Sequence, residues 1–404
     1  MKYLLLALSV VSIARADFSL HDGDTVAFLG DSITAARGYT KIVEHYTLMR
    51  FPDRKIRFVN AGEGGDTASG CLARLDRDVF SKGATVVTVA FGINDIGWGT
   101  KADDAHKKLY LDGIRSIIKR CRERKVRPVI CSPAVTAENP DTAETGYLQT
   151  MTDEGLALAK SLGAETIDLQ RGMREIQRRV VDFNAHTKPE DQVRLHVKDG
   201  IHLDELGHLA MAYAMLKGLG APEDVSSAEI DASTSLVSSE GCVVSQVVKK
   251  ADGLAFTRLD KGLPLNLGPF SQLNYRWIPI PDGINRYLLT VKNLPAGEFE
   301  IRANGRLFGK VPAEELAKGI NMASMTTNGG EPGGPWDMQS CVVKELVDAR
   351  DKLWMGGVLQ TRYQNEVPTK LGAAYVQQEN GLIDLQRRAA KPLAYRFEIK
   401  QVTP

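Results

Sequence analysis

The chain has 404 residues, of which 43% are apolar, and its 51 basic and 50 acidic side chains nearly cancel. This length exceeds what one hydrophobic core usually serves, so we expect two domains. The balanced charge includes no long basic tract, which argues against a nucleic-acid or anionic-membrane partner and favours a small neutral substrate or an uncharged polymer.

Residues 1–16 have the pattern of a secretory signal peptide. Lys2 precedes an apolar segment over residues 4–13, and Ala14-Arg15-Ala16 forms a small-x-small cleavage site. The apolar segment is shorter than the about 20 residues that a membrane span needs. We therefore expect cleavage after Ala16, a secreted or periplasmic protein and no membrane insertion. A buried first strand is the alternative.

From residue 24 to about 219, short β-branched runs alternate with amphipathic stretches. The pattern predicts strands over residues 25–29, 56–60, 85–91, 128–131 and 165–168, and helices over 38–50, 68–80, 102–124, 145–162 and 169–182. Such alternation favours a parallel sheet with helices on both faces. Residues 17–222 are therefore predicted to form a three-layer α/β/α domain, whose last helix begins at Asp204.

The pattern changes after about residue 240. Polar residues 223–240 are expected to form a linker, and residues 241–404 a smaller β-rich domain. Strands are predicted over residues 274–280, 286–294, 298–303 and 394–402, with Pro-Asp-Gly, Pro-Ala-Gly and Asn-Gly turns that favour antiparallel pairing. Helices are predicted over 313–318 and about 336–353. We expect a sandwich-like accessory domain with a helical insertion, serving either carbohydrate binding or a structural role.

The five cysteines are widely spaced and form no CxxC pair, so they indicate no dense disulfide framework. Cys242 and Cys341 are the candidates for a single bridge in an oxidising compartment. No HExxH or clustered His/Asp pattern predicts a metal, and we expect no cofactor.

Four short blocks carry the chemistry. In chain order they are Gly30-Asp31-Ser32-Ile33-Thr34, Gly64-Gly65-Asp66-Thr67, Phe91-Gly92-Ile93-Asn94-Asp95 and Asp199-Gly200-Ile201-His202. With these blocks in this order, the chain resembles the SGNH, or GDSL, hydrolase superfamily over about residues 24–220, and within it the secreted carbohydrate acetylesterases. The first three blocks each follow a predicted strand, and parallel sheets place their sites at these carboxyl ends.

A serine hydroxyl becomes a nucleophile when a base takes its proton and a third group orients that base. We expect Ser32 to be the nucleophile, His202 the base and Asp199 the group that orients His202. The resemblance implies three donors for the oxyanion: the backbone N–H groups of Ser32 and Gly65, and the side-chain amide of Asn94. Gly64 is an alternative to Gly65, one position away.

Other polar residues lie next to these blocks. Asp31 and Asp95 are expected to support their loops through hydrogen bonds to backbone N–H groups. Arg37 and Tyr39 follow the serine block, and we expect them either to contact substrate at the site entrance or to open the first helix.

The function predicted from these features is an exported serine esterase that removes small acyl groups, chiefly acetyl, from a carbohydrate by way of an acyl-enzyme. A lysophospholipase or a broad short-chain carboxylesterase is the alternative within the enzyme class. The alternative outside it is a non-catalytic carbohydrate-binding protein that kept the fold. The oligomeric state is left open.

Overall fold

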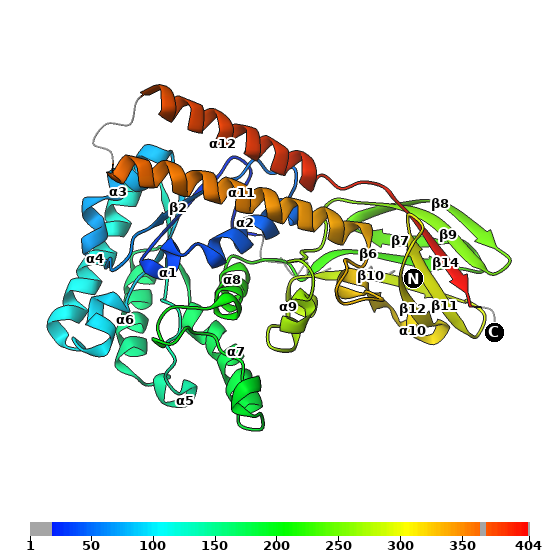
Figure 1. Ribbon diagram of the computed structural model, residues 1–404, viewed down its shortest axis with the longest axis horizontal. Coiled ribbons are helices and arrows are strands. Elements are labelled where there is room, and N and C mark those ends of the chain that lie inside the picture. Colours follow the sequence, from blue (N-terminus) through cyan, green and yellow to red (C-terminus); the bar gives the residue numbers. More distant parts are fainter. Residues whose placement is uncertain (1–17, 364–368, 403–404) are drawn as a thin grey trace, which may run out of the picture.

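A computed structural model describes residues 18–363 and 369–402, and this part of the chain contains three sheets (Figure 1). The predicted signal peptide lies outside the described residues. The first sheet belongs to the α/β part of the chain, and the other two form a β-rich part that follows it.

The first sheet is parallel throughout, with strand order β2-β1-β3-β4-β5. Its strands are β1 (Thr25–Gly30), β2 (Arg57–Gly62), β3 (Val86–Ala90), β4 (Arg127–Cys131) and β5 (Glu165–Ile167). Every residue of β3 is buried, as its continuous apolar run predicts. Since β2 and β3 flank β1 on opposite sides, the strand order reverses at β1, and such reversals are where open α/β sheets place their sites.

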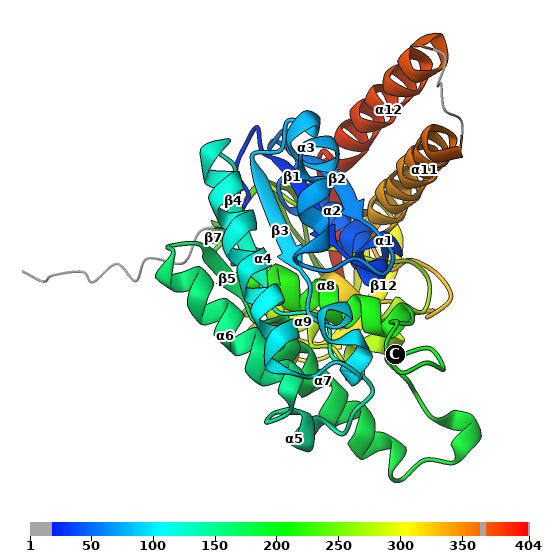
Figure 2. The ribbon, with the colours of Figure 1, turned by 90° about the vertical axis from the view of Figure 1, so that its left-hand side faces the viewer.

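Helices cover both faces of this sheet, as expected (Figure 2). One side carries α4 (Asp104–Glu123) and α6 (Tyr147–Ser161), and the other carries α2 (Gly38–Arg50) and α8 (Glu205–Gly218). The shorter α1 (Ser32–Ala35), α3 (Leu75–Asp78) and α5 (Pro140–Ala143) lie in loops, and α7 (Leu169–Asn184) packs against α8. Asp204 caps α8 by accepting a hydrogen bond of 2.9 Å from the Gly207 N–H.

The β-rich part has a four-stranded sheet of order β13-β10-β6-β7 and a five-stranded antiparallel sheet of order β12-β11-β14-β9-β8. The strands are β6 (Asp224–Asp231), β7 (Val237–Glu240), β8 (Cys242–Lys250), β9 (Gly253–Asp260), β10 (Arg286–Lys292), β11 (Glu298–Ala303), β12 (Arg306–Pro312), β13 (Ile320–Asn321) and β14 (Tyr395–Gln401). Both sheets share one core, which includes the buried rings of Tyr287, Trp336 and Phe397. The predicted sandwich-like packing is therefore present, and the final strand is where we expected it.

The expected linker over residues 223–240 is wrong, because β6 and β7 occupy it. The segment reads as polar, yet alternate positions of β6 such as Ala228 and Ile230 are buried. The expected strand over residues 274–280 is also wrong. A 3₁₀ turn (Ser271–Arg276) and α9 (Ile280–Gly283) take its place, since Pro279 and Pro281 lack the N–H groups that a strand ladder uses.

Two predicted helices also differ. The predicted helix over 68–80 is divided into a 3₁₀ turn (Gly70–Ala73), α3 and a second 3₁₀ turn (Phe80–Lys82). The predicted helix over 336–353 is longer, and α11 (Pro335–Tyr363) is followed by an unpredicted α12 (Thr369–Ala390), while α10 (Ala313–Lys318) is as expected. α12 packs on α11, so this tertiary contact supports a helix whose own pattern is weak.

The α11–α12 hairpin extends from the β-rich part along the α/β part, where α11 packs on α2 (Figure 1). Arg350 of α11 forms an ion pair of 3.2 Å with Glu44 and donates a 2.6 Å hydrogen bond to the Phe58 carbonyl. Charged side chains therefore join two regions that lie about 300 residues apart in the sequence.

All five cysteines are free thiols, so Cys242 and Cys341 do not pair. Cys242 lies on β8, where its thiol contacts the Ser227 carbonyl, and Cys341 lies on α11, where its thiol contacts the Asn266 side chain. Within the described residues, no helix is both long and apolar enough to cross a membrane.

Candidate active site

Ser32 stands directly beyond the carboxyl end of β1, at the point where the strand order reverses. Asp31 caps the short helix α1 by accepting a 2.9 Å hydrogen bond from the Ile33 N–H. The turn is tight, because a Cβ atom on Gly30 would lie 2.1 Å from Oγ1 of Thr34. The local sequence therefore forms a sharp turn after β1, and helix α1 begins at Ser32.

Ser32, His202 and Asp199 are joined by two hydrogen bonds. Nε2 of His202 lies 2.9 Å from Oγ of Ser32, and Nδ1 of His202 lies 2.6 Å from Oδ2 of Asp199. Because an ionised carboxylate can only accept, the proton on the imidazole is assigned to Nδ1, which leaves Nε2 free to accept from the hydroxyl. The structure thus brings together three residues that the sequence separates by up to 170 positions.

The loop that carries His202 is held by its own hydrogen bonds. Oδ1 of Asp199 accepts from the N–H groups of Ile201 and His202, each at 2.9 Å, and Gly200 takes a left-handed φ of 73°. The hydrogen bond from the His202 ring, with these two N–H donors, holds the pKa of the Asp199 carboxyl at about 2. Asp199 therefore stays ionised over the whole range in which an esterase works.

Gly65, the expected backbone donor, needs to be glycine because its φ is +75°, a left-handed conformation. Gly64 has no positive φ, which favours Gly65 over it. The loop is tied down through Asp66, whose Oδ2 accepts a 2.6 Å hydrogen bond from Nε of Arg74. The same buried guanidinium donates to the carbonyls of Gly30 and Ala61, at the ends of β1 and β2.

Asn94 is oriented by a residue that the sequence analysis did not single out. The indole N–H of Trp98 donates a 2.8 Å hydrogen bond to Oδ1 of Asn94, and Nδ2 of Asn94 donates to the Asp66 carbonyl at 3.1 Å. The Trp98 ring also meets the His202 ring edge to face, with centroids 5.6 Å apart. Trp98 therefore contacts both the proposed base and the proposed oxyanion donor.

Trp98 has an unusual backbone for a bulky residue. Its φ is 57°, in the left-handed region, which costs a side chain with a Cβ about 1–2 kcal/mol, and its side chain is 49% exposed. Backbone strain of this kind is characteristic of functional sites. The sequence analysis missed Trp98, although an aromatic residue four positions after Asn94 was a signal that could have found it.

Asp31 and Asp95 support their loops as expected, since Asp95 accepts a 2.9 Å hydrogen bond from the Ala68 N–H. Burial raises the pKa of Asp31 to about 6 and that of Asp95 to about 7, against the lowering effect of their backbone hydrogen bonds. The two carboxyls are therefore structural groups that favour a proton more than ordinary aspartates do.

Of the two expectations for Arg37 and Tyr39, the opening of the first helix is confirmed, because Arg37 is the N-cap residue of α2 and Tyr39 lies in its first turn. Both side chains are buried, so the alternative of contact with substrate at the entrance is not supported. Tyr39 is fully buried, and its hydroxyl lies 3.0 Å from Oγ1 of Thr34. Arg37 is buried against α11, where it forms an ion pair with Asp351 and stacks 4.1 Å above the Trp354 ring. The sequence could not predict this, because the partners of Arg37 lie more than 300 residues away.

Two cavities lie near the loop that carries His202, and one of them includes a triad residue. One of about 480 Å³ is lined by Trp98 and Asp199, and a larger one of about 650 Å³ includes Glu205 and His208 of α8. Neither includes Ser32 among its lining residues. Across the described ranges 18–363 and 369–402, no group of three or more His, Cys, Asp or Glu side chains is arranged to hold a metal ion.

Comparison with known proteins finds a family match over part of the chain and a shared fold over nearly all of it. Residues 28–210 match the GDSL-like lipase/acylhydrolase family. An acetylxylan esterase of Geobacillus stearothermophilus is 24% identical over 225 residues, which are 49% of this chain and 94% of that protein. A crystal structure of an acetylxylan esterase from the same organism, Axe2, is 22% identical, covers 50% of this chain and 96% of its own, and has a TM-score of 0.41.

A solved gut microbial diltiazem-metabolizing enzyme resembles the chain over almost its whole length. It covers 95% of this chain and 98% of its own at 24% identity, with a TM-score of 0.81. The α/β part and the β-rich part therefore occur together in one fold that is already known.

Proposed function

We propose that the chain, whose residues 28–210 match the GDSL-like lipase/acylhydrolase family, is a serine ester hydrolase that removes O-acetyl groups from a neutral carbohydrate polymer. The observation that carries the assignment of the reacting groups is the chain of hydrogen bonds from Ser32 through His202 to Asp199.

In the proposed reaction, Oγ of Ser32 attacks the ester carbonyl while Nε2 of His202 takes the hydroxyl proton. The resulting imidazolium gives this proton to the leaving alcohol, and the acetyl group stays on Ser32. Water then attacks the acyl-enzyme with His202 again as base, which releases acetate. Asp199 keeps the ring in the required tautomer and stabilises its positive charge.

Each attack places negative charge on the former carbonyl oxygen. The proposed donors to that oxygen are the N–H groups of Ser32 and Gly65 and the Nδ2 amide of Asn94. One such donor is worth about 3–4 kcal/mol of transition-state stabilisation. Nδ2 of Asn94 has two hydrogens, and only one is directed to the Asp66 carbonyl, so the other is available.

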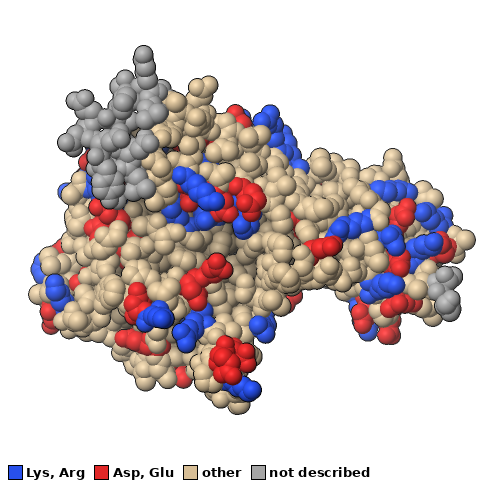
Figure 3. Space-filling model, viewed as in Figure 1, with Lys and Arg blue, Asp and Glu red and all other residues tan. Residues whose placement is uncertain are grey.

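Several features support a neutral polymer as substrate. The net charge is +1, and basic and acidic residues are interspersed on the face shown in Figure 3. The imidazole of His202 is partly exposed, as is the carboxylate of Asp199, so the triad is accessible from the surface. A relative at 24% identity is an acetylxylan esterase, and on this basis we extend the substrate class to acetylated polysaccharides.

Export is part of the proposal and rests on residues 1–16 alone. If the full-length gene product is exported, Edman sequencing of the mature protein should begin at Asp17. A mature protein that retains Met1 would contradict export by this signal.

The assignment is tested by acetate release from acetylated xylan and from p-nitrophenyl acetate. We expect Ser32→Ala and His202→Ala each to lower kcat by at least about 10³-fold, since loss of one triad member removes the activated nucleophile. His106→Ala is the matched control, because His106 also lies 2.9 Å from an aspartate, Asp103, but on α4. Wild-type turnover by either triad variant would refute the site.

The substrate class needs its own comparison. Acetate release from acetylated polysaccharides should exceed acyl release from lysophospholipids and from simple alkyl acetates. A preference for lysophospholipids would instead support the lipase alternative. Binding of polysaccharide without turnover of any ester would support a non-catalytic carbohydrate-binding protein.

A further inference from the structure

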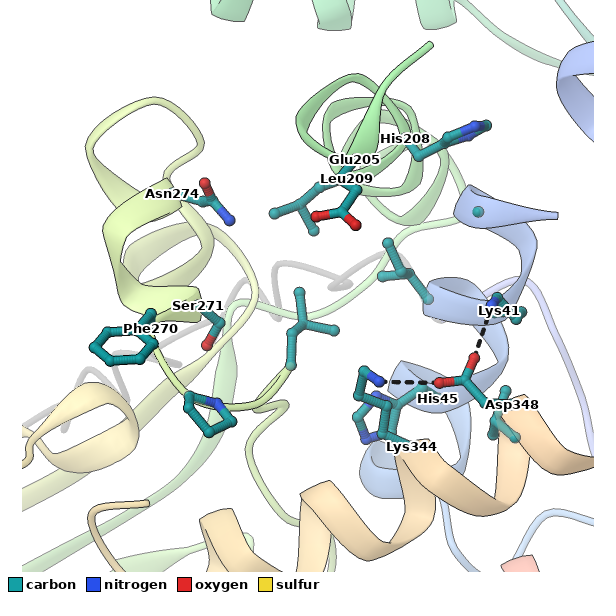
Figure 4. A pocket seen from close by; sticks show the side chains of 15 residues that line it. Lys41, His45, Glu205, His208, Leu209, Phe270, Ser271, Asn274, Lys344 and Asp348 are labelled. Atoms are coloured by element: carbon teal, nitrogen blue, oxygen red, sulfur yellow. Dashed lines mark hydrogen bonds and ion pairs between the residues drawn. The ribbon is translucent and has the colours of Figure 1, made fainter. Parts of the chain in front are cut away.

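The larger cavity lies between the α/β part and the β-rich part and has the properties of a binding site (Figure 4). Its volume of about 650 Å³ is within the usual range of ligand pockets. Its walls come from α2, α8, α11 and the segment around the 3₁₀ turn Ser271–Arg276. Elements from distant parts of the chain therefore meet around one hollow.

Several polar side chains in this cavity lack partners. Oγ of Ser271 and Nδ1 of His45 are buried without a hydrogen bond to any described residue. The Asn274 amide and the Glu205 carboxylate extend into the same hollow, and within the described residues neither is paired. Buried polar groups in native proteins are normally satisfied, so Ser271 and His45 are suited to bonding a ligand or the water that it replaces. Asn274 is half-buried and Glu205 is exposed, so a ligand can reach both from solvent.

The charge of the cavity favours a neutral ligand. Its charged side chains are Lys41, Lys344, Glu205 and Asp348, which cancel, and Asp348 pairs with both lysines at 2.7 and 2.9 Å. Burial lowers the pKa of His45 to about 3, so this ring adds no charge at neutral pH. The cavity thus offers hydrogen-bond donors and acceptors, and its lining side chains carry no net charge.

An aromatic side chain stands at the edge of the cavity. Phe270 has a left-handed φ of 62°, which is unusual for a residue of its size, and its side chain is 57% exposed. Together with Pro269 and Leu267 it forms an apolar surface beside the polar groups. Pyranose rings present apolar C–H faces and polar hydroxyl edges, so they match a pocket of this mixed character.

The cavity is close to the triad. α8 begins at Glu205, three residues after His202, so the Cα atoms of these two residues are at most about 11 Å apart. A glycan chain whose acetyl group is at Ser32 would therefore have only a short distance to span for a neighbouring sugar to occupy the cavity.

From these observations we infer that the cavity is a distal subsite that binds a neutral pyranose unit of the substrate chain, with Phe270 as its platform and Asn274, Ser271 and Glu205 as its hydrogen-bonding groups. The inference rests on the proposed carbohydrate substrate. It gives the junction between the two parts of the chain a role in selecting polymeric over small esters.

The test measures binding of unacetylated xylohexaose, cellohexaose and mannohexaose to the full-length protein by calorimetry. We expect at least one hexaose to bind, and Phe270→Ala to weaken that binding by about tenfold, since aromatic contacts contribute on this scale. Leu273→Ala is the matched control, because Leu273 is 56% exposed on the same turn and does not line the cavity. It should bind as the wild type does.

Failure of all three hexaoses to bind, or equal affinity of Phe270→Ala and the wild type, would overturn the subsite. Because these ligands carry no ester, the result does not depend on turnover. The proposed function fails separately, if the wild type releases no acetate from acetylated polysaccharides. A second variant, Asn274→Ala, should also lose affinity, and retention of full affinity would count against the inference.

Discussion

The hydrogen bond from Trp98 to Asn94 allows a quantitative test of the proposed oxyanion site. Replacing Trp98 with Phe keeps an aromatic ring against His202 but removes the N–H that donates to Oδ1 of Asn94 at 2.8 Å. A neutral hydrogen bond of this kind contributes about 0.5–1.5 kcal/mol net. Trp98→Phe should therefore lower kcat by about 2- to 13-fold, with KM nearly unchanged.

Asn94→Ala removes the donor itself and should cost more, about 10²- to 10³-fold in kcat. If Trp98 acts through Asn94, the double variant Trp98→Phe/Asn94→Ala should be no slower than Asn94→Ala alone. The assay is steady-state hydrolysis of p-nitrophenyl acetate by all four proteins. Additive losses in the double variant, or an unchanged kcat for Trp98→Phe, would refute the reasoning.

Three further predictions concern the loops and the hairpin. Gly65→Ala should lower kcat more than tenfold and the free energy of unfolding by about 1 kcal/mol, because the φ of Gly65 is +75°. Gly64→Ala should change neither quantity. If Gly64→Ala lowered kcat and Gly65→Ala did not, the backbone donor would be Gly64. Asp351→Asn should lower the free energy of unfolding by about 3 kcal/mol, since it leaves the buried Arg37 guanidinium unpaired. Asp348→Asn should lower it by less than about 1 kcal/mol, because its partner Lys41 is more exposed than Arg37, and urea denaturation measures both changes. Asp95 has a raised pKa of about 7, so the folded state holds its proton more tightly and stability falls as pH rises from about 4 to about 7. Asp95→Asn should therefore stabilise the fold at pH 8 by on the order of 2 kcal/mol but not at pH 4, and equal effects at both pH values in urea would contradict this.

The parallel sheet was predictable because its signals are local. The apolar run at β3 and the alternation of strands with helices identified the three-layer fold, and the turn after β1 identified Ser32. The β-rich part was harder. Its strand β6 is polar at alternate positions, and the sequence alone did not distinguish it from a linker. α12 depends on its contact with α11, which no local pattern reports.

The same division applies to the site. The sequence named Ser32, Asp199 and His202 as candidates, because they stand in short blocks whose order resembles that of the SGNH hydrolases and because their residue types suit acyl transfer. They did not identify Trp98, because its importance lies in a hydrogen bond to Asn94 and a contact with His202. They left Arg37 either at the substrate entrance or at the start of the first helix, and they could not show that its ion-pair partner is Asp351.

The sequence by itself thus indicated the reaction class, the strands that the candidate site loops follow, and the residue types that can transfer an acyl group. Only the tertiary structure decided which charged residues join the two parts of the chain. It also decided where a cavity forms between α8 and α11. The reason is physical: backbone turns and nucleophile chemistry depend on neighbours in sequence, whereas burial and pairing depend on neighbours in space.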